Sequence, residues 1–470
     1  MLFSSLVFLW FFLPLIFISY RLLRSIRSQN LLLLVASLFF YAWGEPKYIL
    51  LMLISITVNY ICGICIDKSS VKTKKWALLA CVAINLGLLG YFKYYNFAAS
   101  SVNSILGGAI LPVKDIILPI GISFYTFQAM SYILDLYKGE IKVQKSWFSL
   151  ALYISFFPQL IAGPIVQYSD VQTALHSRTI TARDTSYGIK RFIYGLAKKV
   201  ILANAFAAAA DEIFGLAPDN FGTALAWSGA ILYSLQIYYD FSGYSDMAIG
   251  LGAMFGFTFP ENFNYPYISA SVTEFWRRWH ISLSSWFKKY VYIPLGGNRK
   301  GTSRTLINLF IVFLLTGLWH GANWQFVAWG AYYGILLIIE RVFLRKALEN
   351  KYLKYFSNIY TLLAIIVGWV IFRAPGLNAG ISTVLKLFIP TSGNSAYPVS
   401  RYIDTRLMFL IIVGVLGCGI VQSIFPKFKA LLYNKERIYL AECFFELALL
   451  FICVMLLVSN TYNPFIYFRF

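Results

Sequence analysis

The chain has 470 residues, of which 59% are hydrophobic and only 13% are charged, and its mean hydropathy is +0.67. Soluble globular domains carry about a quarter charged residues, so this composition excludes a soluble protein. Lysine and arginine outnumber aspartate and glutamate by 40 to 20, which gives a formal net charge of +20. Basic cytoplasmic loops and anionic lipid headgroups account for such an excess in a membrane protein, so it does not indicate a nucleic-acid partner.

Apolar runs long enough to cross a bilayer recur along the chain. A spanning helix needs roughly 17 to 25 mostly apolar residues, and these runs lack the two-residue alternation of a transmembrane barrel. The sequence therefore predicts one all-α polytopic membrane domain over residues 1–470, with about eleven or twelve transmembrane helices plus re-entrant and amphipathic segments. The clearest predicted spans are residues 3–20, 30–44, 48–66, 76–92, 305–319, 324–343, 359–374, 406–424 and 438–458.

Loop charges predict the orientation of these spans. Arginines follow the first span, lysines crowd residues 68–75, and more basic residues occupy 427–437, whereas residues 391–405 are polar. Because basic loops stay on the cytoplasmic side, we expect the N-terminus and residues 391–405 to be extracytoplasmic.

The six cysteines all lie in or beside apolar runs, where cysteine behaves as a small apolar residue. Cys62 and Cys65 have the spacing of a redox or metal pair, but no second pair of ligands accompanies them. We therefore interpret the cysteines as helix-packing residues.

Two segments in the first half of the chain are polar or interrupted at membrane depth. Residues 118–136 include Gln128 and several hydroxyl side chains, so this span should line an interior cavity or pack through hydrogen bonds. Residues 156–164 include Gln159, Pro164, a second proline and a glycine. A straight helix is unfavourable there, which predicts a re-entrant or interrupted segment.

The middle of the chain combines a basic face with buried acids. Residues 178–199 predict an amphipathic helix on the cytoplasmic surface that leads into the membrane. The run 223–254 contains Asp240, Ser242 and Asp246. Acids in so apolar a run need partners, and the sequence leaves two possibilities open: an ion pair or hydrogen-bonded packing with a nearby arginine, or a cavity wall that orients a catalytic histidine.

Residues 271–300 interleave aromatic and basic side chains around His280. No nucleic-acid-binding fold surrounds them, so we expect an amphipathic cytoplasmic or re-entrant segment.

His320 lies between two apolar runs, in the sequence TGLWHGANW over residues 316–324. An ionisable imidazole at membrane depth is costly, and such residues usually face a bundle interior or a water-filled cavity. Gly317 and Gly321 flank it and let backbone or ligand approach closely. The alternative is an interfacial belt of tryptophans with the histidine merely hydrogen-bonded beside them.

Long motifs extend over nearly the whole chain. They are FYAW at 40–43, FPQLIAGPIV at 157–166, YDFSGYSD at 239–246, FWRRWHISLS at 275–284, YIPLGGNRKG at 292–301, LTGLWHGA at 315–322 and NPFIYFRF at 463–470. In this order they resemble the membrane-bound O-acyltransferase family, most closely its AlgI-like branch. The resemblance implies a membrane fold with a central tunnel or funnel, and acyl transfer at an embedded histidine.

The resemblance also implies a substrate and a location. An acetyl group would pass from cytosolic acetyl-CoA across the bacterial cytoplasmic (inner) membrane to an extracytoplasmic partner of the SGNH-hydrolase type, which acetylates a polysaccharide such as an alginate-like exopolysaccharide or a cell-wall glycan. Acetyl-CoA would be a substrate, with no permanently bound cofactor and no metal. A D-alanyl branch of the family uses a carrier-protein thioester, although residues 293–299 resemble the acetylating branch more. The alternatives outside the family are a transporter or flippase for a lipid-linked glycan and a non-enzymatic scaffold.

The resemblance matches His320 to the signature histidine of the family and His280 to its second histidine. A neutral buried imidazole suits a general base, so we expect His320 to accept the proton of the incoming hydroxyl. His280 is a second acid or base, or a structural hydrogen-bonding residue, and an acyl-histidine intermediate remains open.

Two further groups of residues complete the predicted site. Basic side chains suit the phosphates of coenzyme A, although each is also explained as an ordinary cytoplasmic-loop charge. The predicted donor-binding residues are Arg277, Arg278, Lys288, Lys289, Arg299 and Lys300. The predicted tunnel-lining residues are Gln128, Gln159, Pro164, Asp240, Ser242, Asp246, Trp319 and Asn323.

Overall fold

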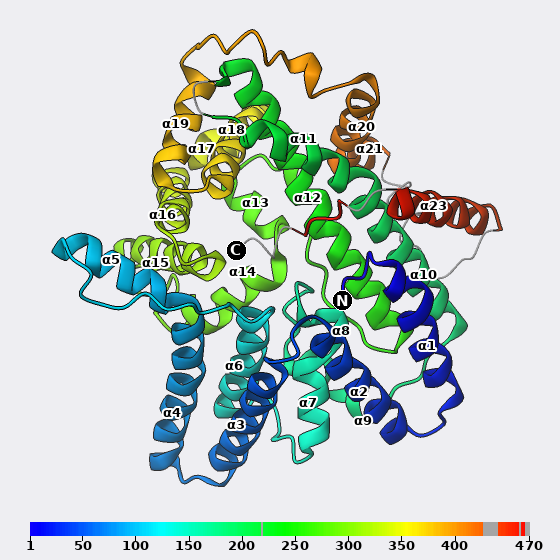
Figure 1. The fold of residues 1–470 in the computed structure, drawn as a ribbon. Coiled ribbons are helices and arrows are strands. Elements are labelled where there is room, and N and C mark those ends of the chain that lie inside the picture. Colours follow the sequence, from blue (N-terminus) through cyan, green and yellow to red (C-terminus); the bar gives the residue numbers. More distant parts are fainter. Residues whose placement is uncertain (218–219, 426–439, 460–461, 466–470) are drawn as a thin grey trace. The chain divides into compact units, whose positions relative to one another are not determined.

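The computed structural model describes residues 1–217, 220–425, 440–459 and 462–465 (Figure 1). The regular elements of these ranges are helices, which confirms the predicted all-α class. The basic loop predicted at 427–437 and residues 466–470 of the C-terminal motif lie outside the described residues.

Nine helices of the described ranges are long and apolar enough to cross a membrane. They are Ile26–Gly44, Ile49–Lys68, Lys72–Leu106, Ala182–Phe214, Thr302–His320, Trp324–Leu348, Lys354–Arg373, Thr405–Ile424 and Leu440–Ser459. The expected eleven or twelve spans exceed this number because the helices in two predicted spans are short: Phe8–Leu22 in the first, and the 17 residues Ile122–Lys138 in the run 118–136. In addition, α12 (Thr223–Met254) carries acids along its 32 residues and is not among the nine.

The chain forms two compact units. Unit 1 comprises Met1–Phe192 and Met247–Pro260, and unit 2 comprises Ile193–Asp246 and Glu261–Phe470. Helices α10 (Ala182–Ala197) and α12 each contribute residues to both.

Unit 1 contains the predicted polar and interrupted segments. Its other elements are η1 (Phe8–Phe12), α1 (Leu13–Leu22), α2 (Ile26–Gly44), α3 (Ile49–Lys68), α4 (Val71–Leu89), η2 (Gly90–Tyr94), α5 (Tyr95–Leu106), α6 (Ile122–Lys138), α7 (Trp147–Ser155), α8 (Phe157–Leu160) and α9 (Tyr168–His176). Almost every residue of α6 is buried, as its polar composition predicts. The expected interruption is present, because α7 ends at Ser155 and α8 has only four residues.

Two expectations about unit 1 need correction. Cys62 of α3 and Cys81 of α4 form a disulfide, so they are not merely packing residues. The spacing of Cys62 and Cys65 does not identify the bonded pair, since the partner of Cys62 is on the next helix. Lys190 and Arg191 of α10 are buried, so the basic face expected over 178–199 is not fully exposed, although the helix continues into a long apolar segment as predicted.

Unit 2 contains both predicted catalytic histidines. Its elements are η3 (Lys198–Ala203), α11 (Asn204–Phe214), η5 (Pro266–Ile268), α13 (Val272–Arg278), α14 (Ile281–Phe287), η6 (Lys288–Tyr292), α15 (Thr302–His320), α16 (Trp324–Ile339), η7 (Glu340–Leu344), α17 (Arg345–Leu348), η8 (Lys351–Leu353), α18 (Lys354–Arg373), α19 (Leu377–Phe388), η9 (Val399–Arg401), α20 (Thr405–Val415), η10 (Leu416–Ile420), α21 (Val421–Ile424) and α23 (Leu440–Ser459). Aromatic side chains, including Trp276, Trp329 and Trp369, form much of its core.

Helix ends follow local signals. Side chains of Ser146, Ser271 and Asp404 accept hydrogen bonds from backbone N–H groups in the first turns of α7, α13 and α20. Helices α2 and α18 end just before Pro46 and Pro375, since the residue preceding a proline avoids helical dihedrals.

The close packing of α15 against α16 determines where His320 lies. A Cβ atom added at Gly317 would lie 2.2 Å from the carbonyl oxygen of Phe326 and 3.0 Å from Cα of Gly330. One added at Gly321 would lie 2.1 Å from the Phe326 ring. The two glycines therefore admit a neighbouring helix and an aromatic ring beside His320.

Changing Gly317 to Ala should destabilise unit 2, because the new methyl group would meet backbone atoms that cannot move aside. We expect a loss of about 1–3 kcal/mol or more, the usual effect of overpacking. The measurement is the thermal unfolding midpoint of the purified full chain in detergent. Gly87→Ala in α4 is the matched control, since a Cβ atom there meets nothing within 4 Å. Equal midpoints for the two variants would contradict the packing role of Gly317.

Candidate active site

His320 is the last residue of α15, and its ring lies in an aromatic cage. The chain turns there because Gly321 and Asn323 are extended, and α16 begins at Trp324. The ring centroid of His320 is 5.0 Å from that of Trp319, 5.2 Å from that of Trp329 and 5.1 Å from that of Phe372. Only 8% of the residue is exposed, so the imidazole is inside the helical bundle and not in an interfacial belt.

His280 occupies a strained position between α13 and α14. Its φ of +45° is left-handed, a conformation that non-glycine residues adopt at a cost of about 1–3 kcal/mol and that gathers at functional sites. The ring meets Phe241 at 4.7 Å and Trp319 at 5.9 Å between centroids. Burial lowers the pKa of His280 well below its ordinary value, and the nearby His320 acts in the same direction. The imidazole is therefore neutral.

A cavity of about 850 Å³ opens beside His280. We call it the basic cavity. Its charged lining residues are Glu274, Arg277, Lys288, Glu340, Arg341, Arg345 and Glu349. The acids are already compensated: Glu274 pairs with Arg278, Glu349 pairs with Arg345, and Glu340 accepts backbone hydrogen bonds. The remaining charge of the cavity is positive.

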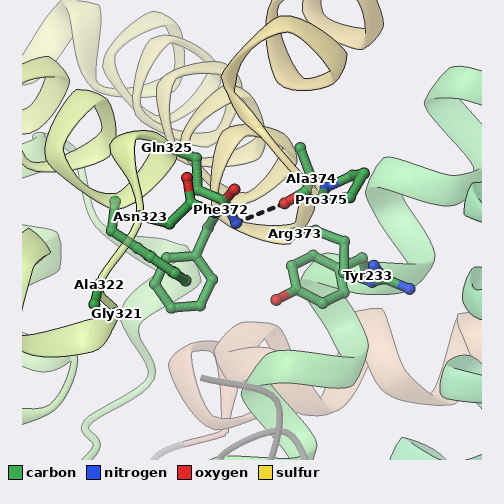
Figure 2. A pocket seen from close by; sticks show the side chains of 10 residues that line it. Tyr233, Gly321, Ala322, Asn323, Gln325, Phe372, Arg373, Ala374 and Pro375 are labelled. Carbon is green, nitrogen blue, oxygen red and sulfur yellow. Dashed lines mark hydrogen bonds between the residues drawn. The ribbon is translucent and has the colours of Figure 1, made fainter. Parts of the chain in front are cut away.

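A second cavity, of about 380 Å³, lies next to the residues that follow His320 (Figure 2). We call it the small cavity. Its lining residues are Tyr233, Gly321, Ala322, Asn323, Gln325, Phe326, Phe372, Arg373, Ala374 and Pro375. The Gln325 amide donates to the carbonyl of Ala374 at 2.6 Å, which leaves its buried oxygen without a hydrogen-bond partner among the described residues. Arg373 is held by Asp211 at 2.7 Å.

The two cavities are lined by different parts of the α15–α16 hairpin. Residues between Leu309 and Thr316 of α15, together with the end of α16, line the basic cavity. The turn that joins α15 to α16 lines the small cavity. His280 lines the first, Phe372 lines the second, and Trp319 and His320 connect these two rings through the contacts given above. A continuous series of ring contacts thus joins the cavities through both histidines.

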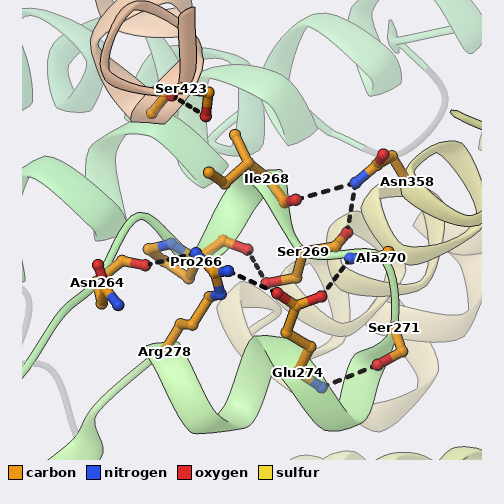
Figure 3. Close-up of polar contacts among 11 residues, drawn as sticks. Asn264, Pro266, Ile268, Ser269, Ala270, Ser271, Glu274, Arg278, Asn358 and Ser423 are labelled. Carbon is orange, nitrogen blue, oxygen red and sulfur yellow. Dashed lines mark hydrogen bonds and ion pairs between the residues drawn. The ribbon is translucent and has the colours of Figure 1, made fainter. Parts of the chain in front are cut away.

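The predicted donor-binding residues separate into two groups. Arg277 and Lys288 line the basic cavity. Arg278 instead forms an ion pair with Glu274 at 2.6 Å and donates to the carbonyl of Asn264 (Figure 3). Lys289 lies over the ring of Tyr290.

Arg299 and Lys300 are exposed in the turn that precedes α15. Arg341 and Arg345 line the basic cavity and were missed by the sequence analysis. Their signal was a basic cluster directly after an apolar run.

The predicted tunnel-lining residues also fall in different places. Trp319 lies between the histidine rings, and Asn323 lines the small cavity. Asp240 pairs with Lys199 at 2.7 Å and Asp246 pairs with Lys198 at 2.6 Å. Of the two possibilities left open for these acids, the structure has the ion pair, but the partners are lysines of η3 and not the expected arginine.

The other predicted tunnel residues are buried. Ser242 lies on α12 in unit 2, while Gln128, Gln159 and Pro164 belong to unit 1. Both polar atoms of the Gln128 amide lack a hydrogen-bond partner among the described residues. Their position along a tunnel stays a prediction.

Glu340 fixes the helix that precedes His280. Its carboxylate accepts from the backbone N–H groups of Val272 and Thr273 at 2.5 and 2.9 Å, and from the Thr273 hydroxyl at 2.6 Å. These groups are at the start of α13, where a helix leaves N–H groups unpaired and favours negative charge. Glu274 holds the loop that precedes α13, because its carboxylate accepts a hydrogen bond from the backbone N–H of Ala270 (Figure 3).

Two buried imidazoles between two cavities, in an all-α membrane protein, are the arrangement expected of a membrane-embedded enzyme. Residues 4–384 match the model of the membrane-bound O-acyltransferase family. The chain belongs to this family, and it is a multi-pass membrane acyltransferase.

Named relatives support the same family. The chain is 44% identical to probable alginate O-acetylase AlgI from Azotobacter vinelandii, over 89% of this chain and 85% of that protein. It is 34% identical to the peptidoglycan O-acetyltransferase of Helicobacter pylori, over 100% of this chain and 98% of that protein. It is 32% identical to the teichoic acid D-alanyltransferase of Bacillus subtilis, over 54% of this chain and 67% of that protein. The resemblance seen in the motifs is confirmed.

Changing Glu340 to Gln should lower the stability of the chain by about 1–2 kcal/mol, because an NH2 group would replace one carboxylate oxygen, and this group cannot accept from a backbone N–H. Thermal unfolding of the purified protein measures it. Glu349→Gln is the control: this acid lines the same cavity but is exposed, so its loss should change stability by less than about 0.5 kcal/mol. An unchanged midpoint for Glu340→Gln would show that α13 does not depend on this carboxylate.

Proposed function

We propose that this protein is an O-acetyltransferase of the bacterial cytoplasmic membrane, which passes an acetyl group from cytosolic acetyl-CoA to an extracytoplasmic acceptor that serves polysaccharide acetylation. The observation that carries the proposal is the pair of cavities joined through His280 and His320. A transfer across a membrane needs a site that two substrates reach from opposite faces.

The charge of the basic cavity supports acetyl-CoA as the donor. Coenzyme A carries several phosphate charges, which arginine and lysine bind through charge-assisted hydrogen bonds. The cavity presents exposed Arg277, Lys288 and Arg341, and its volume of about 850 Å³ lies in the range of small-molecule sites. The positive-inside rule puts this basic end of the hairpin in the cytoplasm, where acetyl-CoA is made.

The small cavity supports an acceptor from the opposite face. It lies at the end of α18 from which α19 leads to residues 391–405, which are expected to be extracytoplasmic. The relatives named as alginate and peptidoglycan O-acetyltransferases modify glycans, so we take the final acceptor to be a polysaccharide hydroxyl. An extracytoplasmic SGNH-type protein is the proposed intermediate carrier.

The proposed chemistry uses an imidazole as a general base beside a thioester. In the proposed reaction His320 accepts the proton of the acceptor hydroxyl while its oxygen attacks the thioester carbonyl carbon. The tetrahedral intermediate collapses with cleavage of the C–S bond, and the CoA thiolate takes the proton back from the imidazolium. One ester and one free thiol result, with no net gain or loss of protons.

Replacing His320 with Ala should therefore reduce acetyl transfer per folded molecule by about 10²- to 10⁴-fold, the usual contribution of a general base. The measurement is CoA release and acetylation of an acceptor by detergent-purified protein, with monodispersity and thermal stability recorded on the same sample. His176→Gln is the control, because His176 lies in α9 of unit 1 and should leave the rate unchanged. Folded His320→Ala protein that retains more than about a tenth of the normal rate would show that His320 is not the base.

Two neighbouring arginines test the donor site separately. Arg277 lines the basic cavity, whereas Arg278 is engaged by Glu274. Arg277→Gln should raise the KM for acetyl-CoA about two- to fivefold with little change in kcat, since an exposed ion pair contributes up to ~1 kcal/mol. Arg278→Gln should leave this KM nearly unchanged. Equal KM values for both variants would remove Arg277 from the donor site.

A further inference from the structure

Asn262 is fully buried beside His280 and makes contacts from both ends of its side-chain amide. Its Oδ1 lies 3.1 Å from the backbone N of Ser282, 2.9 Å from the Ser282 hydroxyl and 3.2 Å from Nδ1 of His280. Its Nδ2 donates to the Ser245 hydroxyl at 3.3 Å. Because a backbone N–H can only donate, the amide atom that faces Ser282 must be the oxygen, and the orientation of this amide is determined.

The orientation of the amide determines the proton on the histidine. An amide oxygen can only accept, so Nδ1 of His280 must carry the hydrogen that lies between them. The buried imidazole is neutral and has a single ring proton, which leaves Nε2 with a lone pair. Nε2 is buried and has no hydrogen-bond partner among the described residues, and His280 lines the basic cavity.

The backbone around His280 holds the same arrangement. Ile281 N–H donates to the Asn262 carbonyl at 3.0 Å, and Asn264 N–H donates to the Arg278 carbonyl at 2.9 Å. Between them Phe263 and Trp279 form an antiparallel bridge. These bonds hold two short segments together and maintain the left-handed φ of His280. Such backbone strain costs free energy and is typical of residues held in place for function.

We propose that Asn262 is a positioning residue that holds His280 as the Nδ1–H tautomer, so that Nε2 is presented to the basic cavity as a hydrogen-bond and proton acceptor. The inference rests on the proposed function in assigning the cavity to the acyl donor. It goes further by giving His280 a defined protonation state and a defined reactive atom, and by assigning a role to a residue outside the histidine motifs.

The tautomer can be measured directly and without any substrate. The chain has three histidines, so ¹⁵N-histidine labelling of the full protein gives three sets of ring signals, and His280→Gln identifies one of them by its loss. We expect the His280 ring of the wild type to have a protonated Nδ1 and an unprotonated Nε2 at neutral pH. A protonated Nε2 would overturn the proposal, whatever the protein does with acetyl-CoA.

Variants of Asn262 test its part in this arrangement. Asn262→Leu removes the acceptor, so we expect the His280 proton to leave Nδ1 and acetyl turnover to fall by about 10²-fold or more, with a smaller change in the KM for acetyl-CoA. Asn262→Asp keeps an oxygen at the same place and should restore the proton on Nδ1. Ser282→Ala is the matched control, because it removes another bond to the same oxygen and should leave the tautomer unchanged.

The outcomes separate the two proposals. An unchanged tautomer in folded Asn262→Leu would refute the positioning role even if acetyl transfer is intact. An Nδ1–H tautomer that depends on Asn262, in a protein that releases no CoA from acetyl-CoA, would support the positioning role and refute the donor assignment. If Asn262→Leu does not fold, the wild-type spectrum and the Asp and Ala variants still decide the question.

Discussion

Charged side chains held in an apolar helical interior constrain unit 2, because an uncompensated buried charge costs several kcal/mol. Lys199 faces Asp240 across two helical segments, and Glu340 faces the N–H groups that begin α13. Each pairing joins elements far apart in the sequence, so compensating the charge also decides which elements lie together. His280 meets the same constraint by staying neutral and giving its one ring proton to an amide oxygen.

Several π-helical segments begin with charged residues that pair with other elements or line the basic cavity. Lys198 and Lys199 begin η3, Lys288 begins η6, and Glu340 begins η7. A π-turn adds a residue to the helical turn and is frequent at functional sites. In η7 the turn lets Glu340 reach α13 while the next residue, Arg341, lines the basic cavity.

The unequal cavities agree with unequal substrates. The larger one is basic and exposed, which suits the proposed acetyl-CoA donor with its several phosphates, whereas the smaller one offers an amide oxygen and an arginine already held by Asp211. The two histidines also lie near different cavities. In the proposed reaction His280 lines the cavity of the donor, and His320 lies among aromatic rings toward the cavity of the acceptor. In the proposed reaction, acetyl transfer would occur beside the ring contacts that connect His280 and His320.

The sequence by itself determined the membrane class, most of the spans and the two histidines. The span expected at 359–374, for example, is α18, Lys354–Arg373. Such features depend on local composition and on motifs, so they can be predicted from the sequence alone. Only the tertiary structure decided that Arg277 lines the cavity while Arg278 pairs with Glu274, because successive residues of a helix point about 100° apart.

The partners of buried polar groups were likewise beyond the sequence. Asn262 meets His280 from 18 residues away, and Glu340 meets Thr273 from 67 residues away. Cys62 bonds to a cysteine on the next helix and not to the one three residues along its own. Each of these pairs depends on how separate helices pack, and hydropathy and spacing carry no information about which side chains face each other across a packed interior.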